Sequence, residues 1–108
     1  MILILGGAFA GKLTWAVREY GLRQTDLCDL RRGFVPGKRC YYHLEDAEPC
    51  PAFPRDAIVI GREIGCGVVP MDAALRLRRE TYGRTLQALA RQSERVFRIF
   101  CGIGEALK

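Results

Sequence analysis

The chain has 108 residues, 49% hydrophobic and 27% charged, a composition that predicts one folded domain over residues 1–108 and excludes a disordered chain. No apolar stretch approaches the roughly 20 residues of a membrane-spanning helix, so we expect no membrane contact. The net charge of +5 fits either a solvated basic surface or a partner that carries phosphates: a mononucleotide, a phosphorylated substrate or a nucleic acid.

The first 21 residues predict a strand, a glycine-rich loop and a helix. Residues 2–5 are all apolar, as in a strand that is buried on both faces of a parallel sheet. Over residues 13–20 the apolar side chains recur at spacings of three and four, which is typical of a helix, and Gly21 is expected to end it. This order of elements is the entry unit of an α/β fold.

The middle third, residues 22–56, gives weaker signals. We interpret Leu27 as the end of a short strand, whereas residues 31–33 and 35–38 have the composition of loops. Residues 40–47 fit either a short helix or a short strand. Prolines at three positions make residues 48–55 a connector.

Regular patterns return at Ala57. Residues 58–60 predict a second buried strand, which ends at Gly61, and residues 62–70 form a loop. Residues 96–101 predict a third strand, followed by a short C-terminal segment after the glycines at 102 and 104.

A long helix is expected between the second and third strands. Asp72 is a suitable N-cap, and the helix should run to about Ser93. Its apolar residues share one face by their spacing: Leu75, Tyr82, Leu86 and Leu89. The chain as a whole therefore predicts an α/β fold with a small, mostly parallel sheet of the P-loop type, flanked by helices.

Residues 6–13 match the phosphate-binding pattern G-x-x-x-x-G-K; they are Gly6, Gly7, Ala8, Phe9, Ala10, Gly11, Lys12 and Leu13. The glycines allow successive amides to face an anion at a helix N-terminus, and Lys12 would reach the β- and γ-phosphates. Leu13 stands where a serine or threonine normally holds Mg²⁺, and Thr14 lies about a quarter turn further around the helix. The alternative interpretation is a glycine-rich turn with an exposed lysine.

Glu63 follows the second predicted strand, at the edge where parallel sheets bind ligands. A carboxylate there would hold Mg²⁺ through water or accept a proton from a substrate hydroxyl. The alternative is a solvated loop glutamate.

His43 is the only histidine, so any histidine chemistry must use it. A structural or exposed histidine is the alternative, and a zinc site with Cys40 and Cys50 matches no strong spacing motif. The five cysteines contain no C-x-x-C pair and are expected to be reduced thiols of a cytoplasmic protein.

Four segments in this order resemble the adenosylcobinamide kinase / adenosylcobinamide-phosphate guanylyltransferase family of cobalamin biosynthesis, and the chain is similar to a shortened member. The segments are the N-terminal Gly-Gly-Ala-x-x-Gly-Lys, then Glu63-Ile64-Gly65-Cys66-Gly67-Val68-Val69-Pro70, then Arg79-Glu80-x-x-Gly83-Arg84, and finally Cys101-Gly102-Ile103-Gly104-x-x-Leu107-Lys108. The resemblance covers residues 1–20 and 57–108.

The resemblance implies a homo-oligomer, purine nucleotide and cobinamide as ligands, and two reactions. ATP or GTP, with Mg²⁺, phosphorylates the aminopropanol hydroxyl of cobinamide, and GMP is then added through a guanylylated histidine, for which His43 is the available residue. The chain departs from the family at Leu13, at Gly61-Arg62 where a polar or acidic residue is usual, and at Leu86 where asparagine is common. The family's Asp-Cys-Leu-Thr motif and the arginine-rich surround of its histidine are absent.

Three functions follow for testing. The first is a cobinamide kinase of impaired activity, in which Lys12 and the loop amides hold phosphates, Glu63 serves the metal or the substrate hydroxyl, and guanylyl transfer through His43 is lost. The second is a catalytically silent nucleotide-binding or partner protein. The third, a nucleic-acid binder, rests on net charge alone and is the least favoured.

Overall fold

A mixed six-stranded sheet forms the centre of the molecule in the computed structural model, which describes all residues except 9, 48 and 64–71. The strands lie in the order β2-β3-β4-β1-β5-β6, and all neighbours are parallel except β5 and β6. Their bounds are β1 Ile2–Gly6, β2 Leu27–Asp29, β3 Cys40–Tyr42, β4 Ile58–Arg62, β5 Arg95–Phe100 and β6 Ile103–Ala106. The predicted α/β class with a mostly parallel sheet is confirmed.

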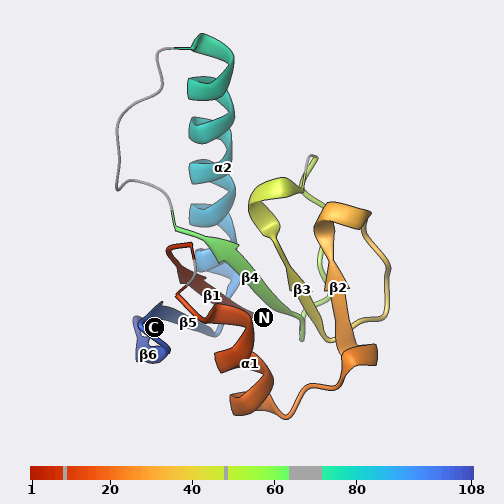
Figure 1. The fold of residues 1–108 in the computed structure, drawn as a ribbon. Helices are drawn as coiled ribbons and strands as arrows, with labels where there is room; N and C mark the ends of the chain where they lie inside the picture. Colours follow the sequence, from red (N-terminus) through yellow and green to blue (C-terminus); the bar gives the residue numbers. More distant parts are fainter. Residues whose placement is uncertain (9, 48, 64–71) are drawn as a thin grey trace.

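Two α-helices lie on opposite faces of the sheet (Figure 1): α1 Lys12–Tyr20 and α2 Ala73–Gln92. Three short 3₁₀ helices complete the described structure: η1 Gln24–Asp26, η2 Leu30–Arg32 and η3 Leu44–Asp46. Neither α-helix is long and apolar enough to cross a membrane, among the residues that the structure describes.

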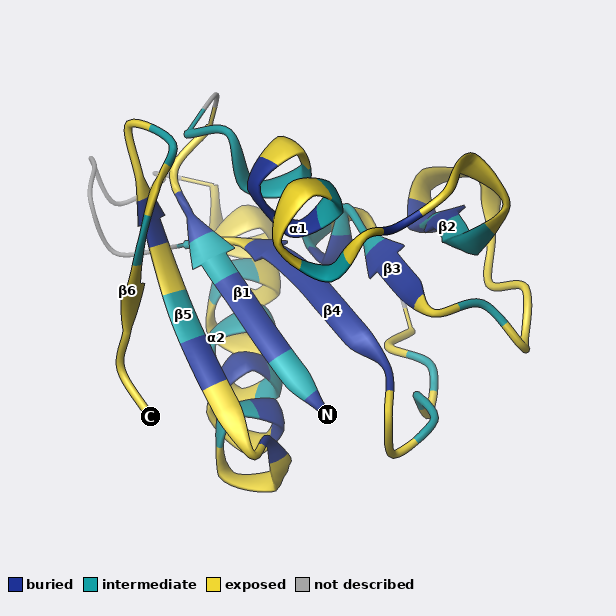
Figure 2. Ribbon diagram, turned by 90° about the horizontal axis from the view of Figure 1, so that it is seen from below, coloured by how far each residue is buried: buried dark blue, intermediate teal, exposed yellow. Residues whose placement is uncertain are grey.

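The sheet separates two hydrophobic clusters because successive strand residues face opposite sides. In β1, Leu3 belongs to the cluster beneath α2 and Ile4 to the cluster beneath α1, and both are fully buried. Figure 2 shows the same contrast across the sheet, with β1 and β4 largely buried and β6 exposed at the edge. The central strands are therefore covered on both faces, as the apolar runs predict.

The predicted ends of both helices are confirmed. Gly21 ends α1 in the left-handed conformation, with φ 60°, which costs glycine little. Asp72 caps α2, since its side chain accepts hydrogen bonds from the amides of Ala74 and Leu75. A carboxylate in this position satisfies amides that have no acceptor within the helix.

The buried face of α2 is shorter than predicted. Leu86 and Leu89 are buried beneath the sheet, but the side chain of Leu75 is 50% exposed. Figure 1 shows why: the first half of α2 extends beyond the end of the sheet, so helical spacing alone placed Leu75 on a face that nothing in the described structure covers.

Three other boundaries correct the predictions. Leu27 begins β2 rather than ending a strand. Residues 40–47 hold both of the expected alternatives in succession, since β3 is followed by η3. The segment after Phe100 turns back as β6, an antiparallel edge strand that the sequence did not indicate.

Candidate functional site

The P-loop residues 6–13 span the end of β1, the turn after it and the start of α1, as predicted, with Phe9 outside the described residues. Gly11 is the N-cap of α1 in the left-handed conformation, φ 84°, and no side chain caps the helix. The first turn also contains no acidic residue. The amides at this helix end thus have no side-chain acceptor among the described residues and form the positive end of the helix dipole, an arrangement suited to an anion.

Lys12 lies inside this loop. Its Nζ donates a hydrogen bond to the carbonyl oxygen of Gly7 at 2.7 Å. Burial lowers the pKa of Lys12, an effect that the charge of Glu45 opposes and that of Arg62 reinforces. The ammonium group is therefore held where a bound phosphate would compete for it.

Glycine is required at position 6. A Cβ there would lie 2.7 Å from the carbonyl oxygen of Ile99 and 3.1 Å from Cγ of Lys12. Strand β5 and the lysine stem therefore approach the start of the loop more closely than any side chain permits.

A cavity of about 540 Å³ opens beside the P-loop on the side of β3. One wall carries Lys12, Leu13 and Thr14 from α1, and Arg31 and Arg62 also line it. The opposite wall carries His43, Glu45 and Asp46, which directly follow β3. We refer to this space as the P-loop cavity.

The three residues of the opposite wall are able to hold a metal ion. His43, Glu45 and Asp46 each offer one ligand atom, and these atoms lie within 4.8 Å of one another. The Oε2 atom of Glu45 is buried and has no hydrogen-bond partner among the described residues, whereas Oε1 lies 3.8 Å from Nδ1 of His43. An imidazole with two carboxylates suits a divalent cation, and a buried carboxylate oxygen without a partner fits such a ligand.

His43 occurs in this group rather than with cysteines. Its backbone is left-handed, φ 64°, and its ring lies 4.9 Å from that of Tyr42. Cys40 points into the buried core, where burial raises the pKa of its thiol to about 12, and Cys50 is exposed. The described residues therefore give no support to a zinc site formed by Cys40, His43 and Cys50.

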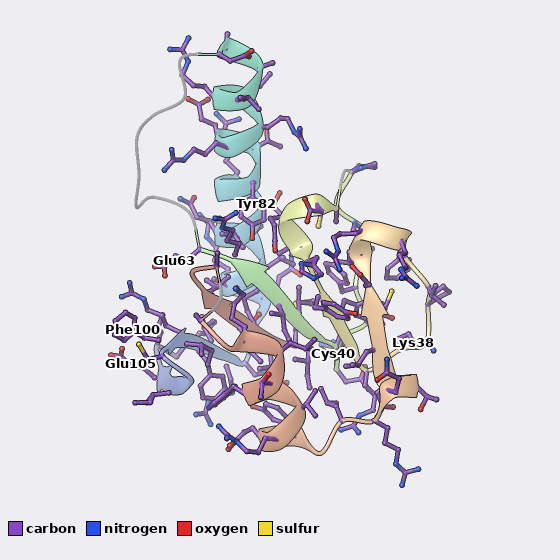
Figure 3. All side chains as sticks on the ribbon, viewed as in Figure 1. Lys38, Cys40, Glu63, Tyr82, Phe100 and Glu105 are labelled. Atoms are coloured by element: carbon purple, nitrogen blue, oxygen red, sulfur yellow. The ribbon has the colours of Figure 1, made fainter. Side chains whose placement is uncertain are left out.

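Glu63 lies on the other side of the P-loop (Figure 3). It lines a second hollow of about 390 Å³ with Gly7, Arg98 and Phe100, and this hollow adjoins the P-loop cavity at Arg62. Its Oε2 accepts a hydrogen bond from Nε of Arg98 at 3.1 Å, and its amide donates to the carbonyl of Gly6 at 2.8 Å. His43, Glu45 and Asp46 thus line one of two adjoining spaces beside the P-loop, and Glu63 lines the other.

Gly61 is explained by packing. A Cβ at this position would lie 2.6 Å from the hydroxyl of Tyr82 on α2, and this hydroxyl donates to the carbonyl of Arg62 at 2.7 Å. The tyrosine thereby ties the end of β4, immediately before Glu63, to α2. Glycine at position 61 therefore makes room for the hydroxyl of Tyr82. This close contact is a local steric reason why the chain departs here from the family pattern.

Sequence reasoning missed Glu45, Asp46 and Arg31 as cavity residues. Glu45 and Asp46 adjoin His43 in the sequence, but β3 is too short for its pattern to show that a strand ends there. The arginine is oriented by Asp29, whose carboxylate accepts from Nη2 at 2.9 Å and from Nε at 3.1 Å. The adjacency of β2, β3, β4 and β1 in the sheet brings these groups to the cavity beside the P-loop.

The sequence of the chain matches a model of a known protein family. A sequence model described as cobinamide kinase / cobinamide phosphate guanyltransferase matches residues 42–107, which is more than half of the chain and begins after the P-loop. A search of curated proteins found no match. The segment from Glu63 to Pro70, one of the four that carry the resemblance, falls within the matched region. Its residues 64–70 lie outside the described structure.

Proposed function

Because the chain belongs to the cobinamide kinase / cobinamide phosphate guanyltransferase family, we propose that it binds a purine nucleoside triphosphate at the P-loop and transfers a phosphoryl group to cobinamide. The family acts in cobalamin biosynthesis and uses ATP or GTP. The observation that carries the proposal is the uncapped N-terminus of α1 beside Lys12, at the wall of the P-loop cavity. A family enzyme needs this combination of amides and a cation to hold a triphosphate.

Lys12 and the amides of residues 6–13 would bind the β- and γ-phosphates. The lysine gives up its hydrogen bond to Gly7 and gains charge-assisted bonds to phosphate oxygens, which are stronger. Arg31 and Arg62, which line the same cavity, add positive charge for the transferred group. These contacts need no metal.

Two positions are available for the metal and for the acceptor hydroxyl. Glu63 would hold Mg²⁺ through water or accept the hydroxyl proton, after release from Arg98. The group of His43, Glu45 and Asp46 would hold the cation on the opposite side. When bound, Mg²⁺ neutralises charge on the β- and γ-phosphates.

A catalytically silent nucleotide-binding protein is the second candidate function. Leu13 favours it, because a leucine cannot supply the oxygen that Mg²⁺ takes from the usual P-loop hydroxyl. The ion pair of Glu63 with Arg98 favours it as well, since this carboxylate is already engaged.

A two-stage experiment tests the two functions. Thermal shifts with ATP, GTP and their diphosphates, with and without Mg²⁺, report binding, because ligands of the native state raise the melting temperature. Incubation with cobinamide and the preferred triphosphate, followed by mass spectrometry of cobinamide, reports turnover. Phosphorylated cobinamide establishes the kinase, a shift without product favours the silent protein, and no shift with any nucleotide contradicts both.

A further inference from the structure

The turn between β5 and β6 lies against the P-loop. Cys101 and Gly102 form this two-residue turn, with φ 49° and 75°, while Phe100 pairs with Ile103 across it. The Gly102 amide donates a hydrogen bond to the carbonyl oxygen of Ala10 at 2.9 Å. Figure 2 shows the turn beside the segment that leads into α1.

This hydrogen bond fixes the orientation of a P-loop peptide. The carbonyl of Ala10 and the amide of Gly11 belong to one planar trans peptide, so they point in opposite directions. When the carbonyl is held by Gly102, outside the loop, the Gly11 amide is directed to the other side. Gly11 lines the P-loop cavity and begins α1, so its amide is one of the donors expected to face a phosphate.

A second contact holds the hairpin against α1. A Cβ on Gly104 would lie 2.4 Å from Cζ2 and 2.7 Å from Nε1 of Trp15. Trp15 is buried, its ring lies 5.0 Å from that of Phe97, and its amide donates to the carbonyl of Gly11 at 2.9 Å. Only glycine at position 104 lets β6 lie this close to the first turn of the helix.

We propose that residues 101–104 are a positioning element of the nucleotide site. The Gly102 amide sets the Ala10–Gly11 peptide for phosphate binding, and Gly104 lets the hairpin rest on Trp15 so that the turn reaches the loop. The inference rests on the nucleotide site proposed above. It gives a role to the segment Cys101-Gly102-Ile103-Gly104, whose residues make no phosphate contact in that proposal.

The decisive experiment removes the single N–H of Gly102. Cys101 permits native chemical ligation of a synthetic peptide 101–108 to a thioester of residues 1–100. A peptide with an ester in place of the Gly102 amide lacks the donor, and the all-amide peptide gives the reference protein. Affinities for GTP and for inorganic tripolyphosphate are measured by calorimetry, and melting temperatures are recorded for both proteins.

The ester protein should bind both ligands about threefold to tenfold more weakly, the range that the loss of one hydrogen bond produces. Both ligands are affected because the peptide acts on phosphates, not on the base. Equal affinities in the two proteins overturn the positioning role. Failure of the reference protein to bind either ligand contradicts the nucleotide site itself, and the positioning role with it.

Substitutions test the Trp15 contact independently. Gly104→Ala should weaken tripolyphosphate binding, and Gly104→Ala with Trp15→Phe should restore it, because the smaller ring makes room for the methyl group. Gly37→Ala is the control for a loss of stability away from Trp15: Gly37 has a positive φ of 86°, which strains any other residue, and a Cβ there meets nothing within 4 Å. It should lower the melting temperature and leave affinity unchanged. If Gly104→Ala does the same, the contact is structural only and the proposal fails.

Discussion

Lys12 is the residue on which phosphate binding depends most directly. It lies inside the P-loop with its ammonium group on the carbonyl of Gly7. We predict that Lys12→Ala weakens nucleotide binding by about 1.5–3 kcal/mol, the usual cost of losing a charge-assisted hydrogen bond. Calorimetry with the preferred nucleotide measures the effect.

Lys38→Ala provides the control for that experiment. The Lys38 ammonium group donates a hydrogen bond to the carbonyl of Thr25, far from the P-loop. The substitution removes the same charge from the protein as Lys12→Ala does. The affinity of Lys38→Ala should equal that of the wild type. Equal affinity of Lys12→Ala and the wild type would show that the nucleotide does not use this loop.

One substitution at Leu13 distinguishes an effect on metal binding from an effect on packing. Leu13 occupies the position of the metal-binding hydroxyl, and it also contacts the hydrophobic cluster beneath α1. We predict that Leu13→Ser increases the gain in nucleotide affinity that Mg²⁺ produces, because serine restores an oxygen ligand near the phosphates. Titrations with and without Mg²⁺ on both proteins test this.

The melting temperature of Leu13→Ser should also fall, since an apolar contact is lost. A lower melting temperature with unchanged metal dependence would mean that Leu13 serves packing alone. A strong Mg²⁺ effect already present in the wild type would assign the metal to Glu63 or to the group of His43, Glu45 and Asp46.

His43 lines the P-loop cavity, but its sequence neighbours Tyr42 and Leu44 are not the arginine-rich surround that the family resemblance implies. Its Nδ1 lies 3.8 Å from Oε1 of Glu45, and its ring lies 4.9 Å from that of Tyr42. We predict that incubation with GTP leaves no covalent GMP on His43. Intact-mass analysis after gentle quenching checks this, and an added GMP that disappears in His43→Ala would restore guanylyl transfer to the chain.

At the scale of elements, helix α2 divides into a packed half and an extended half. Leu86, in the packed half, is 9% exposed and belongs to the cluster beneath the sheet. We predict that Leu86→Ala lowers the free energy of unfolding by about 2–5 kcal/mol, through lost burial and a residual cavity. Chemical denaturation gives the value.

Leu107→Ala makes the same chemical change at a side chain that is 56% exposed. Its effect on the free energy of unfolding should be within about 0.5 kcal/mol of zero. Similar losses for both variants would mean that α2 is not anchored through Leu86 in solution.

At the scale of the whole molecule, the extended half of α2 carries apolar side chains that the described residues leave exposed. Leu75 and Leu77 are 50% and 60% exposed on it. Covering such apolar side chains with a neighbouring molecule removes their surface from water, which favours association. We predict a homo-oligomer with a mass several times 12.1 kDa, measured by sedimentation equilibrium.

Leu75→Asp combined with Leu77→Asp should shift this equilibrium towards the monomer, because a buried charge is costly at an interface. A monomer at all concentrations in the wild type would contradict the prediction. An oligomer that the two substitutions leave intact would place the interface elsewhere.

The sequence by itself determined the features that depend on near neighbours in the chain. The strand of residues 2–5, the glycine loop, the helix ended by Gly21 and the cap at Asp72 all follow from spacing and from local backbone chemistry. The α/β class and the family resemblance follow from the same local patterns in order. Helical spacing failed for Leu75 because it specifies a shared face and not how far the sheet extends beneath it.

The tertiary structure alone decided what faces the P-loop. The order β2-β3-β4-β1-β5-β6 brings residues that follow β3 into one cavity with Lys12, and it brings the β5–β6 turn to the carbonyl of Ala10. Glu45 and Gly102 are 33 and 90 residues from Lys12 in the chain, so no local pattern links either one to it. Strand adjacency is set by the burial of both sheet faces at once, a property of the whole fold that no single segment encodes.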